Sequence, residues 1–217
     1  MTITSNSLPS AAYNTDYRVL PTIGVLSLQG DFREHIEMLA LLGVNSCEVR
    51  LPHQLCDVDA LIIPGGESTT IARLVLEYNF LEPLRNFCDS DKPVWGTCAG
   101  AILLARHVDN LDRPGIQVMD MKIQRNAFGR QLQSFQEDIK IDGIDGDEFP
   151  AVFIRAPIIT TVGTSVEVLA TLPGGEIIAA RQRNLLATVF HPELTKDIRL
   201  HNLFSRMINL DSETSRA

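Results

Sequence analysis

The sequence predicts a single three-layer α/β domain, in which helices cover both faces of a mostly parallel central sheet and an antiparallel hairpin is added. In the first half of the chain, apolar strand-like runs alternate with helical segments, and several strands end in glycine-containing loops. Repeated strand–loop–helix order is typical of parallel sheets covered by helices. In such sheets the chemistry gathers at the carboxyl ends of the strands.

Composition bounds the size and the function of the chain. Its 217 residues, 45% hydrophobic and 21% charged, suffice for one domain. We expect this domain over residues 19–210, between a flexible extension (1–18) and a tail (211–217). The net charge of −8 argues against nucleic acid as a partner. No apolar run reaches the roughly eighteen residues of a membrane span, so we expect no membrane partner.

The four cysteines form neither a CxxC pair nor a metal-binding pattern. We therefore expect reduced thiols in a cytoplasmic protein, with no metal and no other cofactor. Cys47, Cys56 and Cys88 are interpreted as packing residues.

Apolar periodicity predicts three strands and three helices before residue 91. The strands are expected at residues 23–28, 47–51 and 59–64, and the helices at 31–42, 69–76 and 81–90. Asp31 is suited to cap the first helix and Gly43 to end it. Ile36, Leu39 and Ala40 are expected on its buried face.

Residues 93–104 (PVWGTCAGAILL) predict a buried strand, a sharp turn and an apolar helix. Cys98 occupies the apex of a Gly-x-Cys-x-Gly pattern, the thiol counterpart of the nucleophile elbow. Glycines suit such a turn because neighbouring chain comes close. A helix N-terminus favours the thiolate form. The pattern favours a nucleophile over the alternative, a buried structural cysteine.

A second loop, residues 64–68 (PGGES), also follows a strand and opens a helix. Free backbone N–H groups in such a loop can hold developing negative charge. The alternative is a tight turn followed by a helix cap. A nucleophile in the same sheet favours the oxyanion role.

The second half of the chain predicts mainly strands. They are expected at residues 117–123, 135–141 and 151–157, followed by a hairpin of 166–171 and 177–181 around a Pro-Gly-Gly turn. Residues 142–148 read as an acidic surface turn.

The stretch 185–194 (LLATVFHPEL) predicts an apolar strand that delivers His191 and Glu193. Residues two apart in extended chain point the same way, so their side chains are expected to be neighbours. A nucleophilic cysteine needs a base, and the base needs an acidic partner. We therefore predict a triad of Cys98, His191 and Glu193, where an isolated His–Glu pair would be only a solvated ion pair.

Taken together, GTCAG (96–100), HPE (191–193) and PGGEST (64–69) resemble the class I, or triad, glutamine amidotransferases. Four further motifs narrow the resemblance to the glutaminase subunits of pyridoxal 5'-phosphate synthase. They are LSLQGD (26–31), WGTCAG (95–100), NAFGRQ (126–131) and FIRAP (153–157). The similarity runs from about residue 23 to residue 207.

The resemblance implies hydrolysis of L-glutamine to glutamate and ammonia, with Cys98 as nucleophile, His191 as base and Glu193 as its orienting partner. It also implies a partner synthase subunit, a β/α-barrel, that uses the ammonia to build pyridoxal phosphate from a pentose phosphate and a triose phosphate.

Two further sets of residues take their expected roles from the same family. The glutamine-binding positions would be Gly66, Glu67, Ser68, Arg125, Ile154 and Arg155. The N–H groups of Gly66 and Ala99 would hold the oxyanion. Apart from the family, Gln29, Gly30 and Asp31 are candidates for the partner interface, because they lie at a neighbouring strand end of the same sheet edge. The alternative for Arg125 is a surface salt bridge.

Two other functions stay open on the residues alone. One is a cysteine hydrolase of the same architecture that acts on a peptide or another amide. The other is a non-catalytic binding module, against which the intact Cys98, His191 and Glu193 argue.

Overall fold

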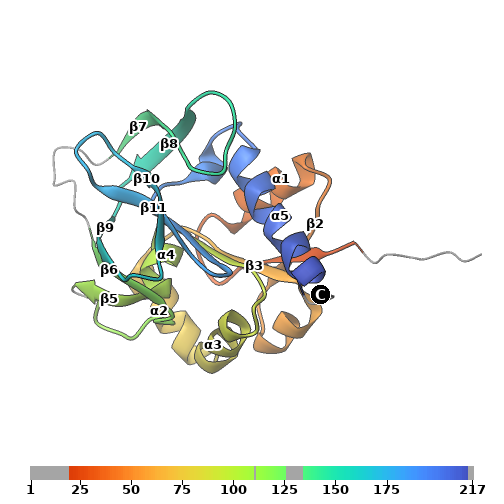
Figure 1. Cartoon of the computed structure of the whole chain (residues 1–217). Coiled ribbons are helices and arrows are strands. Elements are labelled where there is room, and N and C mark those ends of the chain that lie inside the picture. The colour runs from red at the N-terminus through yellow and green to blue at the C-terminus, as the bar shows by residue number, and fades with distance from the viewer. Residues whose placement is uncertain (1–19, 110, 126–133, 215–217) are drawn as a thin grey trace, which may run out of the picture.

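The computed structural model describes residues 20–109, 111–125 and 134–214, with side chains up to residue 208. The NAFGRQ motif and the expected 1–18 extension lie outside these ranges. Within them, a ten-stranded mixed sheet forms the centre of the molecule and a two-stranded sheet lies beside it (Figure 1).

The central sheet begins with a parallel half and continues into a half that is antiparallel except for the parallel pair at its edge, β6 and β5. The parallel strands, in sheet order, are β2 (Asn45–Val49), β1 (Thr22–Leu26), β3 (Ala60–Ile63), β4 (Val94–Thr97) and β12 (Leu185–Thr188). The order continues through β11 (Ile177–Gln182), β9 (Ile158–Val162), β6 (Met119–Gln124) and β5 (Ala105–Asp109), and β10 (Glu167–Thr171) pairs with β11. The second sheet pairs β7 (Ser134–Ile139) with β8 (Phe149–Ile154).

Helices cover both faces of the parallel half. They are α1 (Phe32–Leu41), α2 (Ser68–Glu77), α3 (Leu81–Asp89), α4 (Ala99–Leu104) and α5 (Arg199–Thr214), with 3₁₀ turns η1 (Pro52–Asp57) and η2 (Pro192–Leu194). Helices α1 and α5 lie on one face, and α2, α3 and α4 lie on the other (Figure 1). The expected three-layer fold is confirmed. Among the described residues, no helix is long and apolar enough to cross a membrane.

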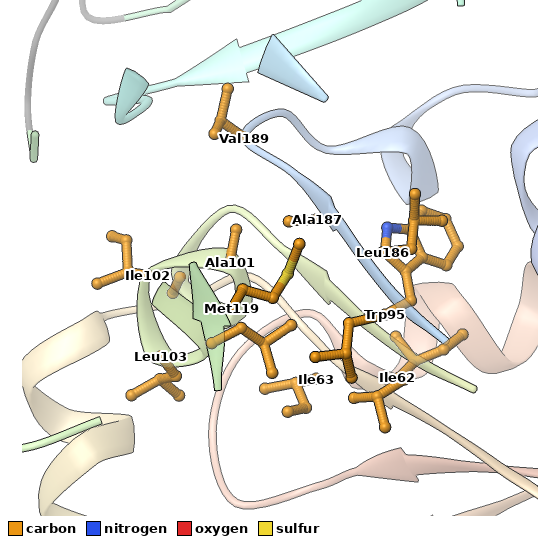
Figure 2. Packing of buried hydrophobic residues seen from close by; sticks show 14 of the residues in the cluster. Ile62, Ile63, Trp95, Ala101, Ile102, Leu103, Met119, Leu186, Ala187 and Val189 are labelled. Atoms are coloured by element: carbon orange, nitrogen blue, oxygen red, sulfur yellow. The ribbon is translucent and has the colours of Figure 1, made fainter. Parts of the chain in front are cut away.

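One continuous apolar core joins the two layers to the sheet. Trp95 and Ile62 are fully buried on neighbouring strands, where they are register partners. Figure 2 shows Leu186 of β12 beside Trp95, and shows Ile102 and Leu103 of α4 in another part of the same cluster. Burial of each such side chain stabilises the fold by roughly 1.5–3 kcal/mol. This packing fixes the strand ends that carry the site.

Several expectations about individual elements need correction. Helix α1 buries His35, Met38 and Leu39, whereas Ala40 is exposed, so the buried face is rotated from the expected one. The rotation brings a polar histidine inward, which apolar periodicity could not show. Strand β9 was not expected, because its residues are mostly half-buried or exposed and show no clear alternation. The hairpin of β10 and β11 is confirmed.

The cysteines are all free, as expected for reduced thiols. Cys88 is buried and Cys47 packs against the core, as predicted. Cys56 is exposed, so its interpretation as a packing residue is wrong.

Candidate active site

Cys98 lies at a strained turn between β4 and α4. Its backbone has φ 44° and ψ −100°, a positive φ that non-glycine residues rarely adopt. The flanking glycines are required by close approach. A Cβ on Gly96 would lie 2.5 Å from the carbonyl carbon of Gly100, and one on Gly100 would lie 1.9 Å from the carbonyl oxygen of Ile63. The predicted nucleophile-elbow geometry is therefore present, and strain of this kind is concentrated at functional sites.

His191 comes off the neighbouring strand. Strands β4 and β12 are parallel, with Thr97 opposite Thr188, and the Cys98 N–H donates to the Thr188 carbonyl at 2.8 Å. The chain after β12 therefore continues beside the elbow. The backbone N–H of His191 donates to the carbonyl of Val152 at 2.8 Å, which ties this turn to β8.

Glu193 is the acidic neighbour of His191, as predicted, but for a different reason. Its Oε1 lies 2.7 Å from His191 Nδ1, and both side chains are buried. The backbone at this point is not extended, because residues Pro192–Leu194 form a 3₁₀ turn with His191 at its N-cap. The turn, rather than strand alternation, brings the carboxylate back to the imidazole.

Asp31 is a second carboxylate beside His191, which the sequence did not place there. Its Oδ2 lies 3.4 Å from His191 Nδ1. Asp31 is the N-cap residue of α1, as predicted, but its side chain makes no capping hydrogen bond. The signal for its position was available, because Asp31 follows β1 at the same carboxyl edge of the sheet that holds the other site residues.

These contacts set the charge of His191. Burial lowers the pKa of this imidazole, but hydrogen bonds with Asp31, Cys98 and Glu193 raise it well above the ordinary value. The imidazolium form is thus favoured. Burial raises the pKa of Glu193, and the hydrogen bond from His191 opposes that rise. The two charges support one another in a nearly dry environment.

Asp31, His191 and Glu193 are also close enough to ligate a common metal ion, since one ligand atom from each lies within 4.8 Å of the others. The 2.7 Å contact between His191 and Glu193 has the length of a charge-assisted hydrogen bond. We interpret the group as a base with its acidic partners.

The Gly65-Gly66 loop interlocks with residues 29–31. Asp31 N donates to Gly65 O at 3.1 Å, and Glu67 N donates to the side chain of Gln29 at 2.8 Å. Gly66 has φ +152°, and a Cβ there would lie 2.7 Å from Gln29 Oε1. Residues 29–31 therefore buttress the loop that carries the expected oxyanion donor. Of the three, Asp31 also lines the cavity.

Glu67 caps helix α2. Its carboxylate accepts hydrogen bonds from the backbone N–H groups of Thr69 and Thr70 and from both hydroxyls. Burial acts to raise the pKa of Glu67, but these hydrogen bonds together prevail and lower it to about 2. Arg125 Nη2 lies 3.7 Å from Glu67 Oε1, an ion pair at the edge of the cavity.

A cavity of about 470 Å³ collects these groups, within the range of small-molecule sites. Its lining includes all the residues predicted for catalysis, oxyanion binding and glutamine binding except the buried Glu193, together with Asp31, Ile102, Pro157 and Leu194. Arg155 contributes from the end of β8 with φ 43°, and Ile154 beside it is 37% exposed. The structure thus brings the predicted residues into one place, while their individual roles remain predictions.

Comparison with known proteins agrees with this arrangement. Residues 25–210 match the SNO glutamine amidotransferase family. The chain is 52% identical over 186 residues to the pyridoxal 5'-phosphate synthase subunit PdxT of Moorella thermoacetica, covering 86% of this chain and 98% of that one. It is 54% identical over 186 residues to the PdxT of Chloroflexus aggregans, covering 84% and 98%.

Solved structures extend the comparison. A crystal structure of a glutamine amidotransferase superposes with a TM-score of 0.82 at 46% identity, covering 86% of this chain and 98% of the other. A putative GMP synthase subunit from Thermoplasma acidophilum, 17% identical with a TM-score of 0.67, shares the fold and covers 91% of this chain and 98% of its own. The match spans almost all of the described chain and nearly the whole length of these relatives, so this chain belongs to the SNO glutamine amidotransferase family.

Proposed function

We propose that this chain is a glutaminase that hydrolyses L-glutamine to L-glutamate and ammonia and supplies the ammonia to a pyridoxal 5'-phosphate synthase subunit, a β/α-barrel. The observation that carries the proposal is the Cys98 elbow beside the buried His191–Glu193 pair, at a cavity that Cys98 and His191 line together with two arginines. Relatives that are half identical over most of their length carry the name pyridoxal 5'-phosphate synthase subunit. We place the reaction in the cytoplasm, in a domain spanning residues 19–210.

The reaction follows from three side chains. The proton of Cys98 passes to His191, where the imidazolium form is favoured, and the sulfur then attacks the side-chain amide carbon of glutamine. The imidazolium of His191 then protonates the leaving nitrogen, so that ammonia departs and a thioester remains on Cys98. Water, deprotonated by His191, attacks the thioester carbon and releases glutamate, and the proton returns to the sulfur. Glu193 holds the imidazole in orientation and stabilises its charge.

The two tetrahedral intermediates carry a negative oxygen that needs donors. Ala99 N–H belongs to the first turn of α4, where N–H groups have no partner within the helix. Gly66 lies across the cavity in the loop before α2. We assign these two N–H groups to the oxyanion. Removal of one such donor typically lowers the rate by about 10²–10³-fold.

The remaining lining residues orient the substrate. Arg125 is 20% exposed at the cavity, and its planar fork suits the α-carboxylate of glutamine. We assign Gly66, Glu67, Ser68, Ile154 and Arg155 to the same substrate site.

Activity is proposed to depend on the synthase, because ammonia released without it is wasted. Residues Gln29, Gly30 and Asp31 touch the Gly65-Gly66 loop directly. Contact of the synthase subunit with these residues would therefore act on the Gly66 N–H, which a peptide rotation can turn toward or away from the oxyanion.

The test is glutamate and ammonia release by the full chain, with and without its synthase subunit, on L-glutamine and on peptide amides. We expect turnover of glutamine alone, and much faster turnover in the complex. Turnover of peptides in preference to glutamine would support the rival hydrolase. Failure of a cysteine-reactive glutamine analogue to label Cys98 would support a non-catalytic module.

A further inference from the structure

Two histidines that have no role in the proposed reaction lie beneath the active site, on the side away from the cavity. His35 of α1 and His201 of α5 are both fully buried, and their Nδ1 and Nε2 atoms, respectively, lie 2.9 Å apart. His35 Nε2 lies 3.2 Å from the hydroxyl of Thr97, the residue before the nucleophile. The same atom lies 3.4 Å from Glu193 Oε2. Two buried imidazoles cost free energy unless they are hydrogen-bonded, so their position needs a reason.

The arrangement selects one set of tautomers. Glu193 Oε2 and His201 Nδ1 are buried atoms that make no hydrogen bond within the described residues. If His201 Nε2–H donates to His35 Nδ1, then His35 carries its proton on Nε2, directed at the Thr97 hydroxyl and Glu193. His201 Nδ1 is then a bare lone pair. The opposite choice would bury an unpaired N–H and turn the lone pair of His35 toward a carboxylate, which is repulsive.

His35 is also held in its neutral form. Burial, together with the charges of His201 and His191, lowers its pKa well below the ordinary value. Burial likewise lowers the pKa of His201, to about 3. A neutral donor can hold one carboxylate oxygen without competing, as a second cation would, for the charge that Glu193 presents to His191.

We propose that His35 is a positioning residue for the base, with its Nε2–H holding Oε2 of Glu193 while Oε1 accepts from His191, and with His201 fixing the tautomer of His35. The proposal rests on the proposed function, in which Glu193 orients His191. Glu193 then spans two imidazoles, which fixes the rotation of its carboxylate and hence the direction of His191 toward Cys98. The 3.4 Å distance is long for a hydrogen bond, but contacts of catalytic groups often shorten only when substrate binds.

Two contacts around His35 support this role over simple packing. The ring of His35 also meets Trp95 edge to face, with centroids 5.7 Å apart, so its orientation is fixed by neighbours other than the carboxylate. Trp95 donates its own N–H to Thr188 Oγ1 at 3.1 Å, so it does not compete with His35 as a donor to Glu193. An apolar side chain of similar size would fill the same space, but it could not donate a hydrogen bond to Glu193.

The first measurement is nitrogen-15 NMR of the full chain labelled at histidine, with the His35 signals assigned by their loss in His35→Gln. The proposal expects a neutral His35 protonated on Nε2 from about pH 6 to 9. A His35 protonated on Nδ1, or an imidazolium in this range, would overturn it. This readout does not require glutaminase activity, so it stands even if the proposed function fails.

The second measurement compares kcat and KM for glutamine in complex with the synthase subunit. His35→Leu removes the donor at similar volume, and His35→Gln keeps a donor near the position of Nε2. We expect kcat to fall by about 10- to 100-fold in His35→Leu, the scale for losing a hydrogen bond to a charged group, with KM within about twofold. His35→Gln should restore most of kcat.

Leu39→Ala is the matched control, because Leu39 is fully buried on the same helix face. It should lower the thermal stability of the protein without lowering kcat in the folded protein. Wild-type kcat in His35→Leu, or an equal loss in His35→Gln and His35→Leu, would overturn the positioning role. Absence of glutamine turnover in the wild-type complex would instead contradict the proposed function.

Discussion

Glu193 Oε1 lies 2.7 Å from Nδ1 of His191, and both side chains are buried at the end of β12. Asp31 approaches the same nitrogen at 3.4 Å from a side chain that is 37% exposed. Two carboxylates thus face one imidazole, and the shorter, drier contact is expected to dominate, because solvent screens the exposed one.

This difference gives the first prediction. Glu193→Gln should lower kcat by at least about 100-fold, toward the 10⁴-fold known for loss of the orienting acid in a triad, because the imidazole loses its tautomer and its countercharge. Asp31→Asn should lower kcat by less than about tenfold. Steady-state glutaminase kinetics of both variants in the complex measure this. A larger loss in Asp31→Asn would make Asp31 the acidic partner.

The second prediction concerns the contact between the two glycine loops. Gly30 has φ +102°, and a Cβ there would lie 1.8 Å from Gly65 O. Gly30→Ala should therefore displace the Gly65-Gly66 loop and lower kcat by about 10²–10³-fold, the effect of losing one oxyanion donor.

Gly43→Ala is its matched control, since Gly43 also has a positive φ, +69°, but faces open space. Gly43→Ala should lose about 1–2 kcal/mol of stability from backbone strain and keep wild-type kinetics. Gly30→Ala should lose more stability, because its Cβ also clashes with Gly65 O. Equal kcat values for the two variants would show that residues 29–31 do not control the position of Gly66.

A third prediction tests the substrate site. Arg125→Ala should weaken glutamine binding by about 1.5–3 kcal/mol, which raises KM by about 10- to 150-fold, if its guanidinium binds the α-carboxylate. Arg125→Lys should recover part of this, because an ammonium cannot form the paired contact. Arg183→Ala is the control, since Arg183 forms an exposed ion pair with Asp91. An unchanged KM in Arg125→Ala would leave Arg125 as a surface salt bridge.

The fourth prediction links Glu67 to acid stability. Its pKa is lowered to about 2 by the hydrogen bonds that cap α2, so its contribution is full above its unfolded pKa of about 4.5 and is lost as pH falls toward 2. Glu67→Gln should cost roughly 1 kcal/mol near pH 6, a modest value because the carboxylate is half exposed. Urea unfolding at pH 6 and pH 3 should show this difference shrinking at the lower pH. An equal difference at both would contradict the capping assignment.

Much of the site could be predicted from the sequence because its parts are local. The elbow needs a glycine at 96 because a side chain there would clash with Gly100, four residues on, and Glu67 stands next to the helix it caps. The pairing of His191 with Glu193 was predicted correctly from extended geometry that the structure replaces with a 3₁₀ turn. The contact survives because two residues of separation allow it in either conformation.

The site residues that the sequence did not predict are placed by packing between segments far apart in the chain. His35 and His201 are 166 positions apart and meet only because α1 and α5 cover the same face of the sheet. Apolar periodicity placed Ile36, Leu39 and Ala40 on the buried face of α1 and gave no reason to expect the polar His35 among the buried residues. Asp31 was assigned to a helix cap for a similar reason: its local position suited a cap, while its actual partner, His191, lies 160 positions away.

The central claim is that Cys98 is the nucleophile that releases ammonia for the synthase. It is tested most directly by pyridoxal phosphate formation in the complex of the Cys98→Ala chain with the synthase subunit, supplied with glutamine or with ammonium salt. We predict no glutamine-dependent formation and a wild-type rate with ammonium, because alanine fits the elbow and leaves the complex intact. Glutamine-dependent formation by the Cys98→Ala complex would contradict the account.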